Sequence, residues 1–136
     1  MHNINAGRYK LVPVKGYEAF SEIYSKAEKY YTRKASAAVI FRNEDEESEP
    51  VINFGVTISK RIAGKAVLRN RIKRLLRESL RLMVKEEVFD FSEIKQIILL
   101  WKIKPRSVRQ FTLNDVYPEV KKLLYKMIMH RNEVRK

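Results

Sequence analysis

The segment FGVTISKRIAGKAVLRNRIKRLLRESLR, residues 54–81, decides the fold, because within it a strand pattern gives way to a helix pattern. Apolar residues alternate with polar or small ones from 52 to 59, which is typical of a strand with one buried face. From 66 to about 85 the apolar side chains recur at helical spacing instead. Together with one serine they share one side of the predicted helix: Ile72, Leu75, Leu76, Ser79, Leu82 and Met83. We therefore predict a strand that leads into a long amphipathic helix.

The same patterns predict the elements on either side of this segment. Residues 17–27 place their apolar side chains on one helical face, and Gly16 marks the start of that helix. Residues 35–41 form a short apolar run that suits a strand. Residues 94–103 are almost continuously apolar, as expected for a strand covered on both faces. With a last helix at the C-terminal end, the predicted order is αββαβα, an α+β sandwich of one sheet with helices.

The last helix is indicated by apolar residues that repeat from Val116 to Ile128. Thr112 resembles a helix cap, but a helix that begins there would place Pro118 well inside it. We therefore predict Asn114 or Asp115 as the cap, since this choice leaves the proline in the first turn, where it is tolerated.

Length and composition indicate one basic domain, residues 1–136, with a formal net charge of +13. An acidic stretch at 43–50 reads as a solvated loop or a long hairpin connection between two antiparallel strands. The chain has no cysteine, which excludes disulfides and thiolate metal sites. Its longest apolar runs, of which Ile97–Trp101 is one, are too short to span a membrane, and the first residues lack the pattern of a signal peptide, so we expect a cytoplasmic protein.

Catalytic motifs are absent from the sequence: it has no Gly-rich phosphate loop, no G-x-S-x-G and no H-E-x-x-H. We interpret His2 and His130 as ordinary surface histidines. The clustered carboxylates of the acidic stretch could hold a divalent ion, but such a run is more often solvated. We therefore assign no catalytic residue and no metal ligand, and we expect any chemistry to be supplied by another molecule.

The strongest functional signal is the basic block at 60–81, which holds nine Lys and Arg residues against one acid, Glu78. It could be simply the solvated face of a helix. However, arginines outnumber lysines six to three, and guanidinium groups bind phosphate bidentately and stack on bases. Cations that crowd one helical face also repel one another unless a polyanion neutralises them. The block favours nucleic-acid binding, with an anionic membrane or a partner helix as alternatives.

Residues 64–77, GKAVLRNRIKRLLR, resemble the signature of the bacterial ribonuclease P protein component, in which an R-N-R triplet leads a basic helix. The preceding FGVTISKR is similar to the strand that enters this helix, and Phe20, Ile23 and Tyr24 resemble the family's first, aromatic helix. Three features depart from the family: an extra Ala63, the long acidic stretch, and Lys102 with Lys104 where an Ala-Arg pair is more usual.

The resemblance implies a mixed sheet like that of ribosomal protein S5 domain 2. Strands 51–59 and 94–103 would lie parallel, joined by a left-handed crossover around the R-N-R helix. Most such crossovers are right-handed, so on this point the expectation follows the resemblance rather than the general rule.

The resemblance also implies a function. Such proteins assist a catalytic RNA that removes the 5′ leader from precursor tRNA, and the RNA with its Mg²⁺ ions carries the chemistry, with no cofactor bound tightly to the protein. We expect one protein per ribonuclease P RNA. Phe20 and Tyr24 would bind the leader by stacking, although either could instead be a core residue. The residues expected to bind the catalytic RNA are Lys60, Arg61, Lys65, Arg69, Asn70, Arg71, Lys73, Arg74 and Arg77.

Two other functions fit the composition. A ribosome-associated RNA-binding protein without a processing role would have the same charge and basic helix. A membrane-surface protein would need an exposed apolar face opposite the basic one, whereas the core requires that face here.

Overall fold

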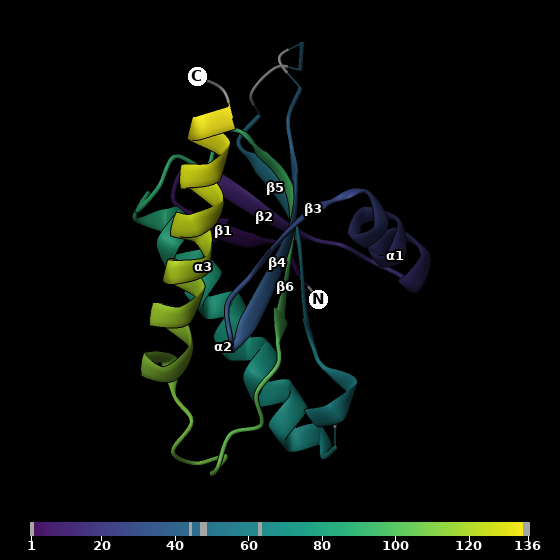
Figure 1. Cartoon of the computed structure of the whole chain (residues 1–136), viewed down its shortest axis with the longest axis vertical. Coiled ribbons are helices and arrows are strands. Elements are labelled where there is room, and N and C mark those ends of the chain that lie inside the picture. The colour runs from purple at the N-terminus through teal and green to yellow at the C-terminus, as the bar shows by residue number, and fades with distance from the viewer. Residues whose placement is uncertain (1, 44, 47–48, 63, 135–136) are drawn as a thin grey trace.

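The computed structural model describes residues 2–43, 45–46, 49–62 and 64–134. A six-stranded sheet in the order β1-β2-β5-β6-β4-β3 forms its centre (Figure 1). The strands are β1 (Ile4–Ala6), β2 (Tyr9–Pro13), β3 (Glu28–Tyr31), β4 (Ala35–Phe41), β5 (Val51–Ile58) and β6 (Ile94–Trp101). The helices are α1 (Tyr17–Lys26), α2 (Ala66–Lys85) and α3 (Leu113–Val134), with a short 3-10 turn at Lys60–Ile62.

The helices cover the two faces of the sheet unequally (Figure 1). α2 and α3 pack together on one face and enclose the main core, in which the side chains of Ile72, Leu76 and Leu124 are fully buried. α1 covers the other face through a smaller cluster built on Ile23 and Ile98. None of the helices in the described part of the chain combines the length and the apolarity needed to cross a bilayer.

The centre of the sheet is the parallel pair β5 and β6, which α2 connects. β5 is also parallel to β2, whereas β6 is antiparallel to β4. Ile97, Ile98 and Leu99 of β6 are all buried, because helices lie over both faces of this strand. The parallel pair, the mixed sheet and the burial of β6 are as predicted; the left hand of the crossover stays a prediction.

Three strands are missing from the predicted αββαβα order, and all three lie toward the edges of the sheet. β1 and β2 form a hairpin around a turn at Gly7, whose φ is +68°. The other edge of β2 pairs with β5, which is distant in the chain. β3 has the sequence EKYY and borders β4. These segments are short and partly polar, so their strand conformation depends on pairing with other strands rather than on a local pattern of side chains.

The acidic stretch does not close a hairpin. The two strands that it connects, β4 and β5, run in opposite directions, but β6 lies between them and hydrogen-bonds to both. Of the acidic residues, Glu44 and Glu47 lie outside the described part of the chain, as do Ser48 and the extra Ala63 of the turn before α2.

The predicted start of the last helix is wrong by two to three residues. α3 begins at Leu113, so Thr112 precedes it and Pro118 lies inside the helix. The carboxylate of Asp115 accepts a hydrogen bond from the Thr112 backbone N–H at 2.8 Å. Asp115 therefore satisfies a backbone donor from within the first turn, as the third residue of a capping box does, instead of standing before the helix.

Candidate nucleic-acid interface

α2 presents the R-N-R triplet because its opposite side is anchored in the core. Leu68, Ile72, Leu75 and Leu76 are buried, which turns the intervening cations outward. No acidic residue lies in the first turn, and the capping position, Lys65, makes no side-chain hydrogen bond to the helix. The N-terminal end of the helix, where backbone N–H groups favour anions, is therefore bordered by positive charge.

Eight of the nine predicted RNA-binding residues line three hollows around α2. Asn70, Arg71, Arg74 and Arg77 line one hollow of about 610 Å³. Arg61 and Lys65 line a second, next to the start of the helix. Lys60, Arg61 and Lys73 border a third, which is a cleft beside α1. Arg69 is half-buried on the same helix.

The cleft lies between α1 and the sheet and has a volume of about 970 Å³. Three aromatic rings of α1 line it, those of Tyr17, Phe20 and Tyr24. Val56 and Ile58 of β5 and Leu100 of β6 contribute apolar side chains, and cations gather at one end. These cations are Lys60, Arg61, Lys73 and Lys102. Aromatic rings beside positive charge are the arrangement that binds single-stranded nucleic acid without strict sequence demand.

Phe20 is held between the cleft and the sheet. A Cβ at Gly55 of β5 would lie 3.0 Å from Cε2 of the Phe20 ring, so the absence of a side chain at 55 lets the ring approach the sheet closely. The ring is half-buried and packs against the cluster of Ile23, Ala38 and Ile98. Phe20 thus both supports α1 and faces the cleft.

Tyr24 packs beside the same cluster and is also half-buried. The ammonium of Lys29 lies 4.8 Å from the centre of its ring, a cation–π contact. Tyr17, about two helical turns before it, is 84% exposed at the cleft. Sequence reasoning left Tyr17 out of the candidate leader-binding residues, although its place on the same helical face could have included it.

The cations on α2 are unequally neutralised within the protein. Arg81 donates to both carboxylate oxygens of Glu78, at 2.9 Å and 2.5 Å, and these bonds lower the pKa of Glu78 and raise that of Arg81. Burial, and then the charge of Arg74, lower the pKa of Arg77. Glu78, the acid of the basic block, therefore neutralises Arg81. Arg74 and Arg77 instead repel each other, which favours the binding of an external anion beside them.

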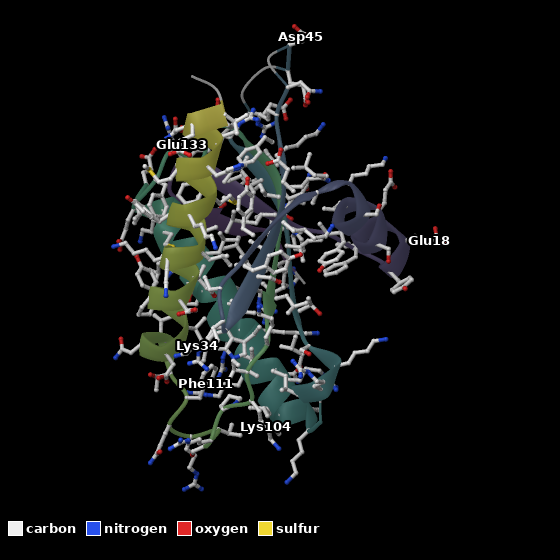
Figure 2. The ribbon with its side chains drawn as sticks, viewed as in Figure 1. Glu18, Lys34, Asp45, Lys104, Phe111 and Glu133 are labelled. Carbon is white, nitrogen blue, oxygen red and sulfur yellow. The ribbon has the colours of Figure 1, made fainter. Side chains whose placement is uncertain are left out.

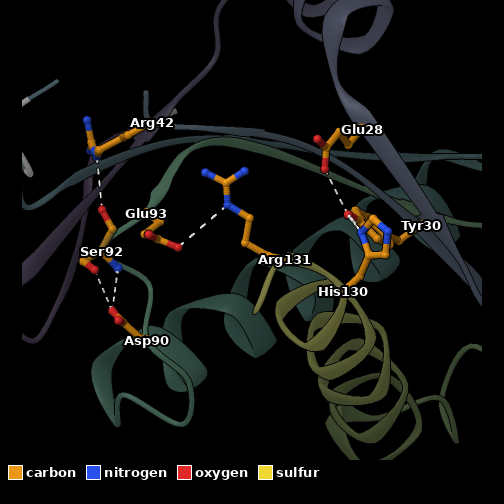
Figure 3. Close-up of polar contacts among 8 residues, drawn as sticks. All are labelled: Glu28, Tyr30, Arg42, Asp90, Ser92, Glu93, His130 and Arg131. Atoms are coloured by element: carbon orange, nitrogen blue, oxygen red, sulfur yellow. Dashed lines mark hydrogen bonds and ion pairs between the residues drawn. The ribbon is translucent and has the colours of Figure 1, made fainter. Parts of the chain in front are cut away.

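Several carboxylates elsewhere, together with His130, contact neighbouring side chains (Figure 3). Glu28 accepts a hydrogen bond from the Tyr30 hydroxyl at 3.0 Å, and that hydroxyl lies 2.8 Å from Nδ1 of His130. In the acidic stretch Glu46 forms a 3.0 Å ion pair with Lys95. Within the described residues no three His, Asp or Glu side chains gather as a metal site would require.

A second basic segment, residues 102–112 between β6 and α3, was not among the predicted site residues. It holds Lys102, Lys104, Arg106 and Arg109 and no acid. Figure 2 places Lys104 and Phe111 of this segment at the end of the molecule where α2 begins. The signal in the sequence was the density of cations without a compensating carboxylate.

Comparison with known proteins gives one consistent result. Residues 10–128 match the family model described as Ribonuclease P. The ribonuclease P protein component of Geobacillus kaustophilus is 28% identical over 123 residues, which cover 90% of this chain and 88% of that protein. That of Rippkaea orientalis is 27% identical over 78 residues, 57% of this chain but only 61% of the relative.

Among solved structures, the fold is similar to that of the Staphylococcus aureus RNase P protein, with a TM-score of 0.59 and 23% sequence identity. The superposition covers 85% of this chain and 94% of that one. The likeness confirms the mixed α+β fold, in which a sheet carries helices on both faces.

Proposed function

Because the chain belongs to the ribonuclease P protein family, we propose that it is the protein subunit of a ribonuclease P. In this role it binds the catalytic RNA and the 5′ leader of precursor tRNA, and assists endonucleolytic removal of the leader. The relatives named above are ribonuclease P protein components, and they give the ribosomal alternative no support.

One observation about the site supports the proposal most directly: the basic helix α2 contributes a side chain to the lining of the aromatic cleft. Lys73 of α2 lines the same cleft as Phe20 and Tyr24 of α1. A separate hollow on the same helix is lined by Asn70, Arg71, Arg74 and Arg77. A protein built in this way can hold a structured RNA with one side of α2 and guide a single strand into the cleft with the other.

The chemistry of cleavage is assigned to the RNA and to Mg²⁺ that the RNA holds. In this proposal the protein contributes position and charge. Aromatic rings in the cleft stack on leader bases, and the cations beside them neutralise leader phosphates.

Reconstitution tests the proposal. The protein is added to a bacterial ribonuclease P RNA at low magnesium, and leader removal from precursor tRNA is timed. We expect acceleration over RNA alone, and no cleavage by RNA-free protein. An equal rate with and without protein, combined with tight binding to ribosomal RNA, would favour the ribosomal alternative.

A further inference from the structure

Hydrogen bonds and a ring contact connect the segment between β6 and α3 to its neighbours. Phe111 is buried, and its ring meets Trp101 edge-on with ring centres 5.7 Å apart. The indole N–H of Trp101 donates to the Ile103 carbonyl at 2.7 Å. The Phe111 backbone N–H donates to the Ser107 carbonyl, which closes a turn. The segment is therefore anchored at both of its ends.

The contact that ties this segment to α2 comes from the R-N-R triplet itself. The Nε–H of Arg71 donates to the Phe111 carbonyl at 2.8 Å. One of the arginines expected to bind RNA thus uses one of its N–H donors for a hydrogen bond within the protein. Its guanidinium still lines the hollow that it shares with Arg74 and Arg77, so its charge remains part of that surface.

Cations of the segment face the same hollows as those of α2. Arg109 and Val108 line the hollow that also contains Asn70 and Arg74. Lys104, Arg106 and Arg109 line the neighbouring hollow of about 720 Å³ together with Arg61 and Lys65. Neither hollow is lined by an acid in the described residues. Val67, which is 71% exposed, lies between the two sets of cations and offers an apolar surface to a ribose or a base.

We propose that the β6–α3 segment is the second wall of the RNA site. Arg106 and Arg109 bind phosphates of the RNA that α2 also binds, and Arg71 is a positioning residue that holds this wall in place. The inference rests on the proposed function and deepens it, because it assigns the catalytic RNA a two-sided site in place of a single helical face.

Salt dependence of binding tests the wall. The affinity of the protein for a bacterial ribonuclease P RNA is measured over a range of salt concentrations, for the natural chain and for Arg106→Ala/Arg109→Ala. Each lost phosphate contact lowers the slope of log affinity against log salt by up to about one, so the double variant should lose up to about two. The control is Lys121→Ala/Lys122→Ala, which removes the same charge from exposed positions on α3.

The positioning role of Arg71 has its own readout, because Trp101 is the only tryptophan of the chain. Arg71→Lys keeps the charge but loses the Nε–H that bonds Phe111. We expect greater quenching of Trp101 fluorescence by acrylamide, with unchanged helix content. We also expect the Arg109→Ala effect on RNA affinity to be smaller in the Arg71→Lys background than in the natural chain, since coupled residues are not additive.

The outcomes of these experiments distinguish the second wall, the proposed function and the positioning role of Arg71 from one another. If Arg106→Ala/Arg109→Ala matches the lysine control while Arg74→Ala weakens binding, the second wall is wrong and the proposed function stands. If the natural chain shows no salt-dependent binding to this RNA, both are wrong. If Arg71→Lys leaves Trp101 quenching unchanged and the effects add, Arg71 does not position the wall.

Discussion

Gly55 controls how closely α1 approaches the sheet, because a Cβ at this position would lie only 3.0 Å from Cε2 of the Phe20 ring. Gly55→Ala should push the ring outward and destabilise the fold by about 1–3 kcal/mol, the usual cost of overpacking. Urea unfolding measures this. Gly64→Ala is the matched control, since no atom lies within 4 Å of a Cβ built there, and we expect it to be neutral or slightly stabilising. Equal effects at the two positions would contradict the packing argument.

Tyr24 and Phe20 differ in how closely each ring packs against the sheet. Losing a stacking contact costs about 1–3 kcal/mol of binding per base, whereas removing a buried aromatic destabilises a fold by about 3–5 kcal/mol. Tyr24→Ala should follow the first pattern, and Phe20→Ala, whose ring meets Gly55, should show part of each.

The measurement for both variants compares precursor tRNA that carries a 5′ leader with mature tRNA that lacks one. Affinity for the first should fall and affinity for the second should stay. A Tyr24→Ala protein that unfolds, or that loses both RNAs equally, would remove Tyr24 from the leader-binding residues.

At the scale of elements, α3 docks on β3 through Tyr30, which is 8% exposed. Burial and the hydrogen bond to Glu28 raise the pKa of Tyr30 from 10.0 to about 12, although the charge of Arg131 opposes the shift. Because the pKa of Tyr30 is higher in the folded state, its protonated hydroxyl contributes its full stabilisation at pH values below the pKa of the unfolded chain. That stabilisation is lost as the pH rises from about 10 through about 12, because the unfolded chain then releases its proton first.

Tyr30→Phe should therefore flatten the decline of unfolding free energy at high pH. Urea unfolding of both proteins at about pH 9 and about pH 11 isolates this contribution, since the other tyrosines and the lysines titrate in both. Parallel declines for the two proteins would show that Tyr30 does not ionise differently in the folded state.

The elements that the sequence could predict were those whose side chains follow a clear period of burial. The predicted strand at 35–41 and the helix at 66–85 coincide with β4 and α2, because burial imposes a clear period on their side chains. Local pattern could not predict β3, since EKYY becomes a strand only by pairing with β4. The start of α3 was missed because Pro118 is accommodated inside the helix.

Sequence spacing could relate candidate site residues only within a single helix, either α1 or α2. The spacing of the R-N-R cations placed them on the outer side of α2, as the structure does. That Arg71 would hydrogen-bond Phe111, forty residues later, depends on tertiary contact. The approach of Phe20 to Gly55 depends on such contact as well, because α1 and β5 are distant in the chain.

At the scale of the whole molecule, a net charge of +13 makes association with any polyanion strongly salt-dependent. Individual cations should nevertheless contribute unequally. Arg74→Ala should lower the slope of log RNA affinity against log salt by up to about one. Arg81→Ala, the control on the same helix, should lower it less, because Glu78 already neutralises Arg81. Identical slopes for the two variants would show that Arg74 is a solvated surface residue that contacts no phosphate.

The position of β6 between β5 and β4 has a consequence for synthesis of the chain. The group β1-β2-β5 and the pair β3-β4 consist of strands that the ribosome completes before residue 94, and β6 then joins the two parts. Until β6 emerges, β5 and β4 each present an open edge, a template for pairing with other chains. A nascent chain that stalls after α2 would therefore expose the two edges that are most protected in the finished protein.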